Sequence, residues 1–165
     1  MSQIFKPMTI RSMKALIGPM TLICLLLVNS CKKEKDTLDK TQLLTNGSWK
    51  LTTMTVEPAI DWFGTPVTNV YLQLPTCVKD DLTIFKSNGI INYDEGASKC
   101  NPNDPQTTTG TWTFNTDQTI LSITTNGSST ESWDISELTD TRFEAEYPVI
   151  EEGVTYSFFV VFEKQ

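Results

Sequence analysis

The sequence contains no histidine and few basic residues. Its 165 residues include 13 Lys plus Arg against 20 Asp plus Glu, which gives a formal net charge of −7. The absence of histidine excludes Ser-His-Asp and Cys-His catalysis, histidine-ligated zinc and an imidazole proton shuttle. The excess of acid excludes nucleic-acid binding, because phosphate backbones attract clusters of basic side chains.

Hydrophobic runs long enough to cross a bilayer are also missing. The main apolar run, Ala15–Val28, has 14 residues, fewer than the roughly 17–25 that a membrane-spanning helix needs. It follows a start that carries Lys6, Arg11 and Lys14 and no acid. This arrangement is typical of a secretory signal, which we assign to residues 1–30. Cleavage removes three of the 13 basic residues and leaves 10 against 20 acidic ones, a net charge of −10.

The apolar run ends in Val28-Asn29-Ser30-Cys31, which resembles a bacterial lipobox. The resemblance implies cleavage before Cys31, a diacylglyceryl group on its sulfur and an acyl group on its new N-terminus. Two or more acyl chains anchor a protein stably, whereas one chain binds only marginally. We therefore expect a lipid-anchored protein of the cell envelope, at the outer membrane in either leaflet. The alternative is an ordinary signal peptide followed by an unmodified cysteine.

Behind the predicted anchor, the chain divides into a tether and one folded domain. Residues 31–40 are charged and typical of a solvated tether, whereas residues 41–165 have the size of a single domain. Asp36-Thr37-Leu38 resembles the O-glycosylation motif of Bacteroidota, so Thr37 is a candidate glycan site. Of the four cysteines, Cys77 and Cys100 remain once Cys24 is cleaved off and Cys31 is lipidated. In an exported protein, two such thiols favour a disulfide over a metal or redox site.

From Asn46 onward, the pattern is one of short strands. Threonines and aromatic residues recur in short alternating runs, and no long stretch repeats at helical spacing. About eight strands joined mainly by tight turns predict an all-β, antiparallel up-and-down barrel, because an uncovered meander must close or expose its edges. The expected strands are 49–57, 82–86, 90–94, 109–114, 119–125, 130–135, 142–147 and 154–163.

One hairpin allows a prediction of register. A two-residue turn at Asn88-Gly89 would pair Phe85 with Asn92 and Leu82 with Glu95. Continued outward, the same register brings Cys77 and Cys100 opposite each other, which supports the disulfide.

The segment 58–76 interrupts the strand pattern. Pro58, Pro66 and Pro75 exclude a central strand here, and Val67–Leu74 is compatible with one short helix. Trp62 and Phe63 lie at the tip of this long connection. We expect them either to pack on the rim of the barrel or to form a lid that contacts a ligand, with rim packing favoured.

Several of these residues together resemble a known family. Gly47-Ser48-Trp49 is similar to the opening motif of lipocalins, and the stretch 77–89, with Gly96–Cys100 and Gly110–Phe114, resembles the lipocalin-like domain common in lipoproteins of Bacteroidota. The resemblance covers about residues 41–163. It implies a small barrel whose base is closed by Gly47 and Trp49, and which binds a small apolar molecule. In lipocalins an arginine near the last strand packs over the tryptophan, but the alternation places Arg142 on the outer face and one strand too early.

The acidic residues do not form a pattern with a defined chemistry. Glycosidases use two carboxylates at set separations, but no spacing here singles out a pair. Asp80, Asp81, Asp94 and Glu95 meet at one end of a hairpin, without the alternating loop that calcium sites often use, so a solvated acidic rim is the favoured interpretation. We predict no catalytic residue, metal site or cofactor.

Two functions remain open. The first is a binding protein that holds a small apolar or amphipathic molecule in the barrel. The second is a non-enzymatic surface interaction module, an inhibitor or accessory subunit with a filled barrel, whose acidic exterior meets a basic protein partner. A hollow interior would favour the first function, and a filled barrel with an exposed aromatic loop would favour the second.

Overall fold

The computed structural model describes residues 39–125, 127 and 129–165. The signal segment 1–30, Cys31 and Thr37 lie outside the described residues, as does almost all of the tether, and their predictions stay untested. In the described part the elements are α1 (Lys40–Thr45), β1 (Trp49–Trp62), β2 (Thr65–Asn69), a 3₁₀ turn η1 (Tyr71–Gln73), α2 (Thr76–Lys79), β3 (Leu82–Phe85), β4 (Ile90–Asp94), β5 (Thr107–Phe114), β6 (Ile120–Thr125), β7 (Thr130–Leu138), β8 (Arg142–Glu151) and β9 (Val154–Lys164).

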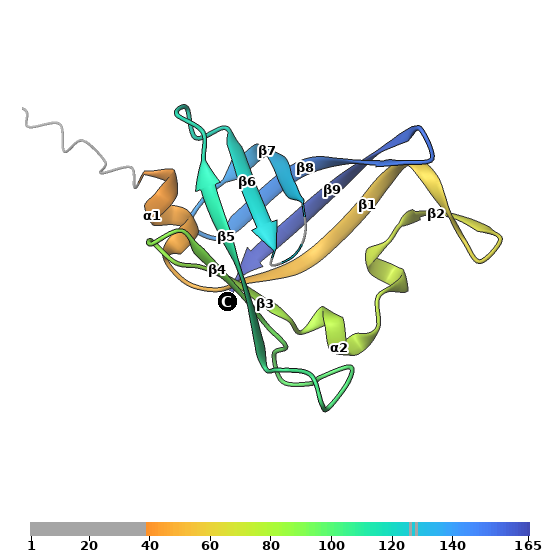
Figure 1. Cartoon of the computed structure of the whole chain (residues 1–165), viewed down its shortest axis with the longest axis horizontal. Helices are drawn as coiled ribbons and strands as arrows, with labels where there is room; N and C mark the ends of the chain where they lie inside the picture. Colours follow the sequence, from red (N-terminus) through yellow and green to blue (C-terminus); the bar gives the residue numbers. More distant parts are fainter. Residues whose placement is uncertain (1–38, 126, 128) are drawn as a thin grey trace, which may run out of the picture. The chain divides into compact units, whose positions relative to one another are not determined.

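The strands form one antiparallel sheet that closes on itself (Figure 1). Neighbouring strands follow the order β2-β1-β3-β4-β5-β6-β7-β8-β9, and β1 also pairs with β9. The closed barrel therefore consists of eight strands, β1 and β3 to β9, as the sequence predicts. The seams of β1 differ in strength: β9 pairs with it from Trp49–Lys164 to Glu57–Ser157, whereas β3 meets it only at Trp49–Thr83 in the described chain.

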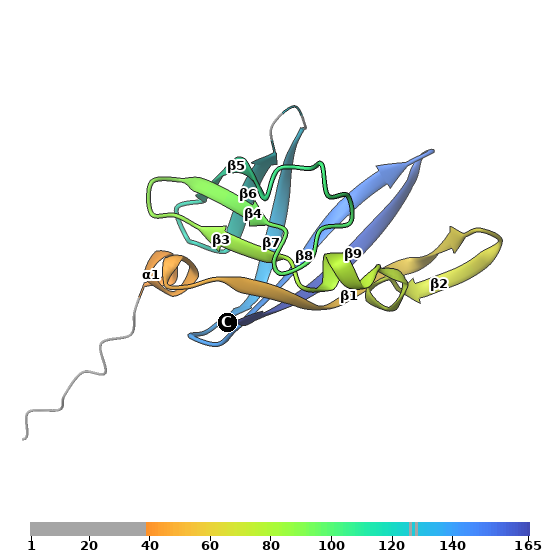
Figure 2. The same cartoon turned by 90° about the horizontal axis from the view of Figure 1, so that it is seen from below.

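The exclusion of a central strand from residues 58–76 holds, but the expected first strand, 49–57, is too short. Strand β1 continues through Pro58 to Trp62 and folds back into β2, which contains Pro66. The pairing of β1 with β9 ends at Glu57, so the prolines fall where β1 has left the barrel and on an edge strand, where a missing N–H is tolerated. The β1–β2 and β8–β9 hairpins both extend on the side away from α1 (Figures 1 and 2).

The expected short helix after the first strand is also present, but it is displaced. Within the predicted range only Tyr71–Gln73 forms a 3₁₀ turn, and the α-helical turn is Thr76–Lys79. Pro75 precedes this turn at its N-cap, and proline fits helix starts because its missing N–H has no partner there. The shift places Cys77 on a helical turn instead of an extension of the hairpin.

The predicted register of the β3–β4 hairpin is wrong by one residue. Phe85 pairs with Ile91, not with Asn92, and Leu82 pairs with Asp94. The loop has three residues because Lys86 N–H donates to the Ile90 carbonyl at 2.8 Å. Gly89 takes a left-handed φ of 81° inside it, which is typical of three-residue hairpin loops. This register puts two core residues opposite each other, whereas the predicted one would turn Asn92 toward the core.

The core fills the end of the barrel that α1 covers. Helix α1 starts at a capping box in which the Asp39 carboxylate accepts from the Gln42 N–H at 2.9 Å, which satisfies otherwise unpaired donors. Its Leu44 is fully buried and belongs to the main apolar cluster. The other members of this cluster are Trp49, Phe85, Ile91, Trp112, Leu121, Ile123, Phe143, Ala145, Val160 and Phe162.

Trp49 connects the helix to the barrel. Its side chain has 0% exposure, its indole N–H donates to the Leu44 carbonyl at 2.8 Å, and its ring meets Phe143 edge-on at 6.0 Å. Gly47, just before it, has a φ of +126°, and a Cβ there would lie 2.8 Å from Cε of Lys164. The Gly-x-Trp spacing thus combines a backbone turn that favours glycine with a buried ring.

We expect Trp49→Ala to lower the free energy of unfolding by about 3–5 kcal/mol, because it empties a large buried site and leaves the Leu44 carbonyl without its donor. Chemical denaturation measures this loss. Phe63→Ala is the matched control, because Phe63 is 95% exposed and surface substitutions usually change stability by less than about 0.5 kcal/mol. A loss below about 1 kcal/mol for Trp49→Ala would contradict its structural role.

Candidate functional site

The inner face of the barrel changes character from one end to the other. Near α1 it is lined by fully buried side chains such as Phe143, whereas four residues further along β8 the ring of Tyr147 is only partly buried. We call the end of the barrel opposite α1 the mouth. There the inner-facing Trp133 and Tyr147 are partly buried and pack against the core.

A ladder of parallel rings lines one wall of the mouth. Trp133 on β7 stacks on Tyr147 of β8 with a centroid distance of 4.6 Å and an interplanar angle of 10°. Tyr147 stacks in turn on Phe158 of β9, its cross-strand partner, at 5.4 Å and 11°. The three rings come from three adjacent strands, and each covers part of its neighbour's face. Aromatic surfaces of this kind stabilise flat or apolar ligands through large contact areas.

The carboxylate of Glu131 lies at this end of the barrel, beside Trp133. Glu131 accepts a hydrogen bond from the Trp133 indole N–H at 3.0 Å. Burial, together with the charge of Glu131, raises the pKa of Tyr147 to about 12. The pKa of Tyr93 on β4 is raised by the same two causes, against a hydrogen bond to Thr125 that lowers it. Both phenols therefore stay protonated at neutral pH, and neither supplies a base for catalysis.

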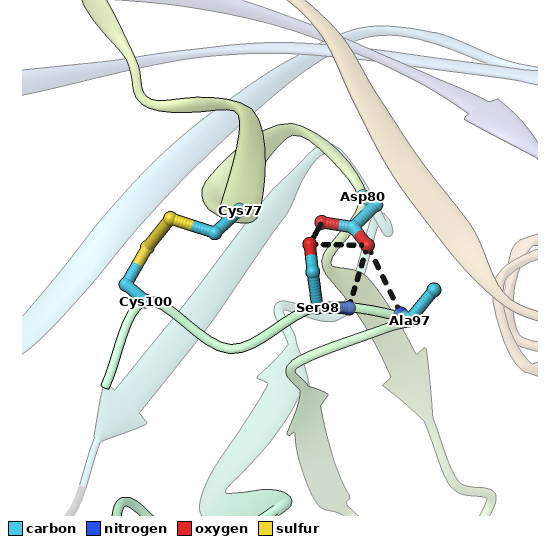
Figure 3. The surroundings of a disulfide bond; sticks show 5 residues. All are labelled: Cys77, Asp80, Ala97, Ser98 and Cys100. Carbon is cyan, nitrogen blue, oxygen red and sulfur yellow. Dashed lines mark hydrogen bonds between the residues drawn. A yellow bond between two sulfur atoms is a disulfide. The ribbon is translucent and has the colours of Figure 1, made fainter. Parts of the chain in front are cut away.

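The disulfide fastens the loop between β4 and β5 to α2. Cys77 on α2 is bonded to Cys100 with a Cα–Cα distance of 5.2 Å, within the usual range for disulfides. Beside it, Asp80 accepts hydrogen bonds from the Ala97 and Ser98 N–H groups at 3.0 and 2.9 Å and from the Ser98 hydroxyl (Figure 3). These bonds lower the pKa of Asp80. The prediction of the disulfide is confirmed, although the register that supported it is not.

The acidic cluster of the sequence comes together around the buried side of Asp81. Burial raises the pKa of Asp81 to about 6, and Glu95, Asp80 and Asp94 add to the effect through their charges. Its Oδ1 is buried and accepts no hydrogen bond from a described residue. Within residues 39–125, 127 and 129–165, no group of three or more side chains has a geometry that could hold a metal ion.

Trp62 and Phe63 do not lie where the sequence analysis expects them. They occupy the tip of the β1–β2 hairpin, which projects from the barrel (Figure 2), and their rings contact each other edge-on at 6.0 Å. The exposure of Phe63 rules out packing on the rim. Strand β1 continues through Pro58 and carries these residues beyond the barrel. The alternative of a lid that contacts a ligand stays a prediction.

Lys164 has a position that the sequence analysis did not assign to any residue. It lies on the last strand opposite Trp49, its stem approaches Gly47, and its ammonium group pairs with Asp140 at 2.8 Å. Arg142, as predicted, faces outward, where it pairs with Glu137 and Glu144. The cation over the base of the barrel is thus a lysine at the end of the chain, and the basic residue count alone gave no signal for it.

Comparisons with known proteins find a matching family profile and solved structures of low sequence identity. A profile of the lipocalin-like domain matches residues 45–145, while a comparison with curated proteins finds no match. Bovine odorant binding protein complexed with its natural ligand is 14% identical, over 81% of this chain and 77% of that chain, with a TM-score of 0.43. Its complex with a selenium-containing odorant is 13% identical over the same shares, with a TM-score of 0.42. No helix in the described part of this chain is long and apolar enough to cross a membrane.

The raised pKa of Asp81 predicts a pH dependence of stability. Because the folded state binds this proton more tightly than the unfolded state, with pKa values of about 6 against 3.8, the free energy of unfolding should fall as pH rises between these values. Asp81→Asn should remove that fall and stabilise the protein by about 1 kcal/mol at pH 7, since solvent screens part of the repulsion. The gain should vanish below pH 4.

Denaturation at a series of pH values measures this effect. Asp80→Asn is the matched control with the opposite sign, because its pKa is lowered by hydrogen bonds and its loss should destabilise the protein at neutral pH. If Asp81→Asn destabilises the protein equally at pH 4 and pH 7, the carboxylate of Asp81 does not have the raised pKa on which this prediction rests.

Proposed function

This chain belongs to the lipocalin-like domain family, and on that premise we propose that it binds a small apolar or amphipathic molecule at the mouth of its barrel. The observation that carries the proposal is the ladder of Trp133, Tyr147 and Phe158. These rings face inward, yet they remain partly exposed and stacked in parallel. A filled core would bury such rings, whereas a binding surface leaves them accessible and already ordered, which reduces the entropy cost of binding.

The opposite end supports the same interpretation. The cluster around Trp49 is buried and leaves no room for a ligand at the α1 end. An incoming molecule would therefore rest on the side of the core that faces the mouth. The phenols of Tyr93 and Tyr147 offer hydrogen-bonding groups above the apolar wall. Small-molecule sites commonly combine such an apolar lining with a few polar groups that fix orientation. No group in this arrangement has a nucleophile next to a base, so we propose a binding protein without catalytic activity.

We further propose that the domain is held at the cell envelope through a lipidated Cys31. The support is the basic start, the short apolar run and Val28-Asn29-Ser30-Cys31. The proposed site would then stand clear of the membrane on the charged tether 31–40. Such a protein would capture or retain its ligand near the membrane surface.

A second candidate function has an observation of its own in its favour. Phe63 at the β1–β2 tip is 95% exposed, and Ile150 at the β8–β9 tip is 74% exposed. Asp61 and Glu151 flank these apolar tips, so a protein partner would need an apolar pocket with a basic rim. Native mass spectrometry of the protein from its own host separates the candidates: a retained stoichiometric small molecule supports the first, and a protein lost on Phe63→Ser supports the second.

Ligand binding at the mouth is tested with the neutral dye N-phenyl-1-naphthylamine. Its fluorescence should rise on binding, and Phe158→Ala should weaken the affinity about tenfold, which corresponds to roughly 1.4 kcal/mol. Phe159→Ala is the matched control, because Phe159 is the next residue on β9 and lines hollows on the outer face. Absence of dye binding, or a larger effect of Phe159→Ala, would contradict the proposed site.

The anchor is tested by phase separation in detergent. The full chain expressed in a lipoprotein-processing bacterium should enter the detergent phase, and Cys31→Ser should move it to the aqueous phase because no acyl chain can be attached. Cys24→Ser is the control, since Cys24 lies in the segment that is cleaved off. If the Cys31 variant stays with detergent, the lipid anchor is disproved.

A further inference from the structure

Glu131 projects from the inner face of the barrel, at its mouth. Glu131 and Trp133 lie on β7, where they pair with Ile123 and Leu121 of β6. Paired residues of neighbouring strands point to the same side of a sheet, and both partners belong to the buried core, with exposures of 4% for Ile123 and 0% for Leu121. The carboxylate therefore continues an inward-facing row whose deeper members are apolar.

Glu131 interacts with residues of three strands. It accepts from the Trp133 indole at 3.0 Å, and its charge acts on Tyr93 of β4 and on Tyr147 of β8. Since β4 and β8 are not adjacent in the sheet, its charge reaches phenols on two separate strands. A molecule resting against the aromatic ladder would meet it.

No basic side chain compensates this carboxylate in the described part of the chain. The ion pairs there are Arg142 with Glu137 and with Glu144, and Lys164 with Asp140. Arg142 lies on the outer face, and Lys164 lies at the end near α1. The mouth thus has an exposed carboxylate beside apolar rings, where it can attract a group of opposite charge.

We propose that the ligand is an amphipathic organic cation, in which an ammonium group pairs with Glu131 while an apolar or aromatic body lies against Trp133, Tyr147 and Phe158. The inference rests on the proposed binding function and adds the chemical class of the ligand to it. An anionic molecule of the same shape would meet repulsion from the same carboxylate.

The test uses three probes with one apolar body and different charges: 2-naphthylmethylammonium, 2-naphthylmethanol and 2-naphthoate. Their affinities are measured at pH 7 by displacement of N-phenyl-1-naphthylamine. The ammonium probe should bind about tenfold more tightly than the alcohol, and the carboxylate probe should bind more weakly than the alcohol. Glu131→Gln keeps the shape and an acceptor for the Trp133 indole, so it should abolish the tenfold preference for the ammonium probe over the alcohol.

Glu146→Gln is the matched control. It removes the same charge from β8, where Glu146 stands opposite Phe159 and Asp134 on the outer face. This variant should keep the full preference for the ammonium probe. If it reduces the preference as much as Glu131→Gln does, the preference comes from the overall acidity of the protein and the inference is overturned.

The remaining outcomes distinguish a failure of the proposed ligand class from a failure of the proposed binding function. If the dye and the alcohol bind but the ammonium probe has no advantage, or if Glu131→Gln retains that advantage, the ligand class is wrong while binding at the mouth stands. If neither the dye nor the alcohol binds to the wild-type protein, the proposed function fails, and the inference that rests on it is overturned with it.

Discussion

Burial of the Trp49 indole is the interaction on which the rest of the barrel depends. Trp49 joins three parts of the chain. Its indole N–H bonds to Leu44 of α1, its backbone pairs with Thr83 of β3, and it stands opposite Lys164 of β9. Eight strands enclose little more space than their own side chains fill. A large ring at one end therefore decides which end is solid, and it leaves the other end to be lined by partly buried side chains.

The division between a solid base and an aromatic mouth connects the fold to the proposed function. The packing of Phe143 against Trp49 and Phe162 keeps β8 and β9 in place. The same two strands then present Tyr147 and Phe158 toward the mouth at a fixed spacing. A binding surface held in this way needs no rearrangement before it contacts a ligand, because rigid strands and ring stacking already order it.

The eight strands of the barrel and their closure could be predicted, because side-chain alternation and turn residues act locally. The disulfide could be predicted from the two cysteines left in an exported chain, and not from the hairpin register. The register around Gly89 could not, since two- and three-residue loops with Asn-Gly differ only in where the left-handed glycine falls. The course of β1 through Pro58 could not be predicted either. It depends on β1 having left the barrel at Glu57, where its pairing with β9 ends, and this is a property of the tertiary structure. Glu131 was missed for a related reason: its place on the inner face follows from the pairing of β6 with β7, and neither its neighbours in sequence nor its charge reveals it.

The central claim is that a ligand binds at the aromatic mouth, and the indole N–H resonances of the four tryptophans test it most directly. During titration with N-phenyl-1-naphthylamine, the resonance of Trp133 should shift because its ring lines the site, while that of Trp49, sealed in the base, should not move. Single Trp→Phe variants assign the signals. A shift confined to Trp62 at the hairpin tip, or no shift at saturating dye, would contradict the account.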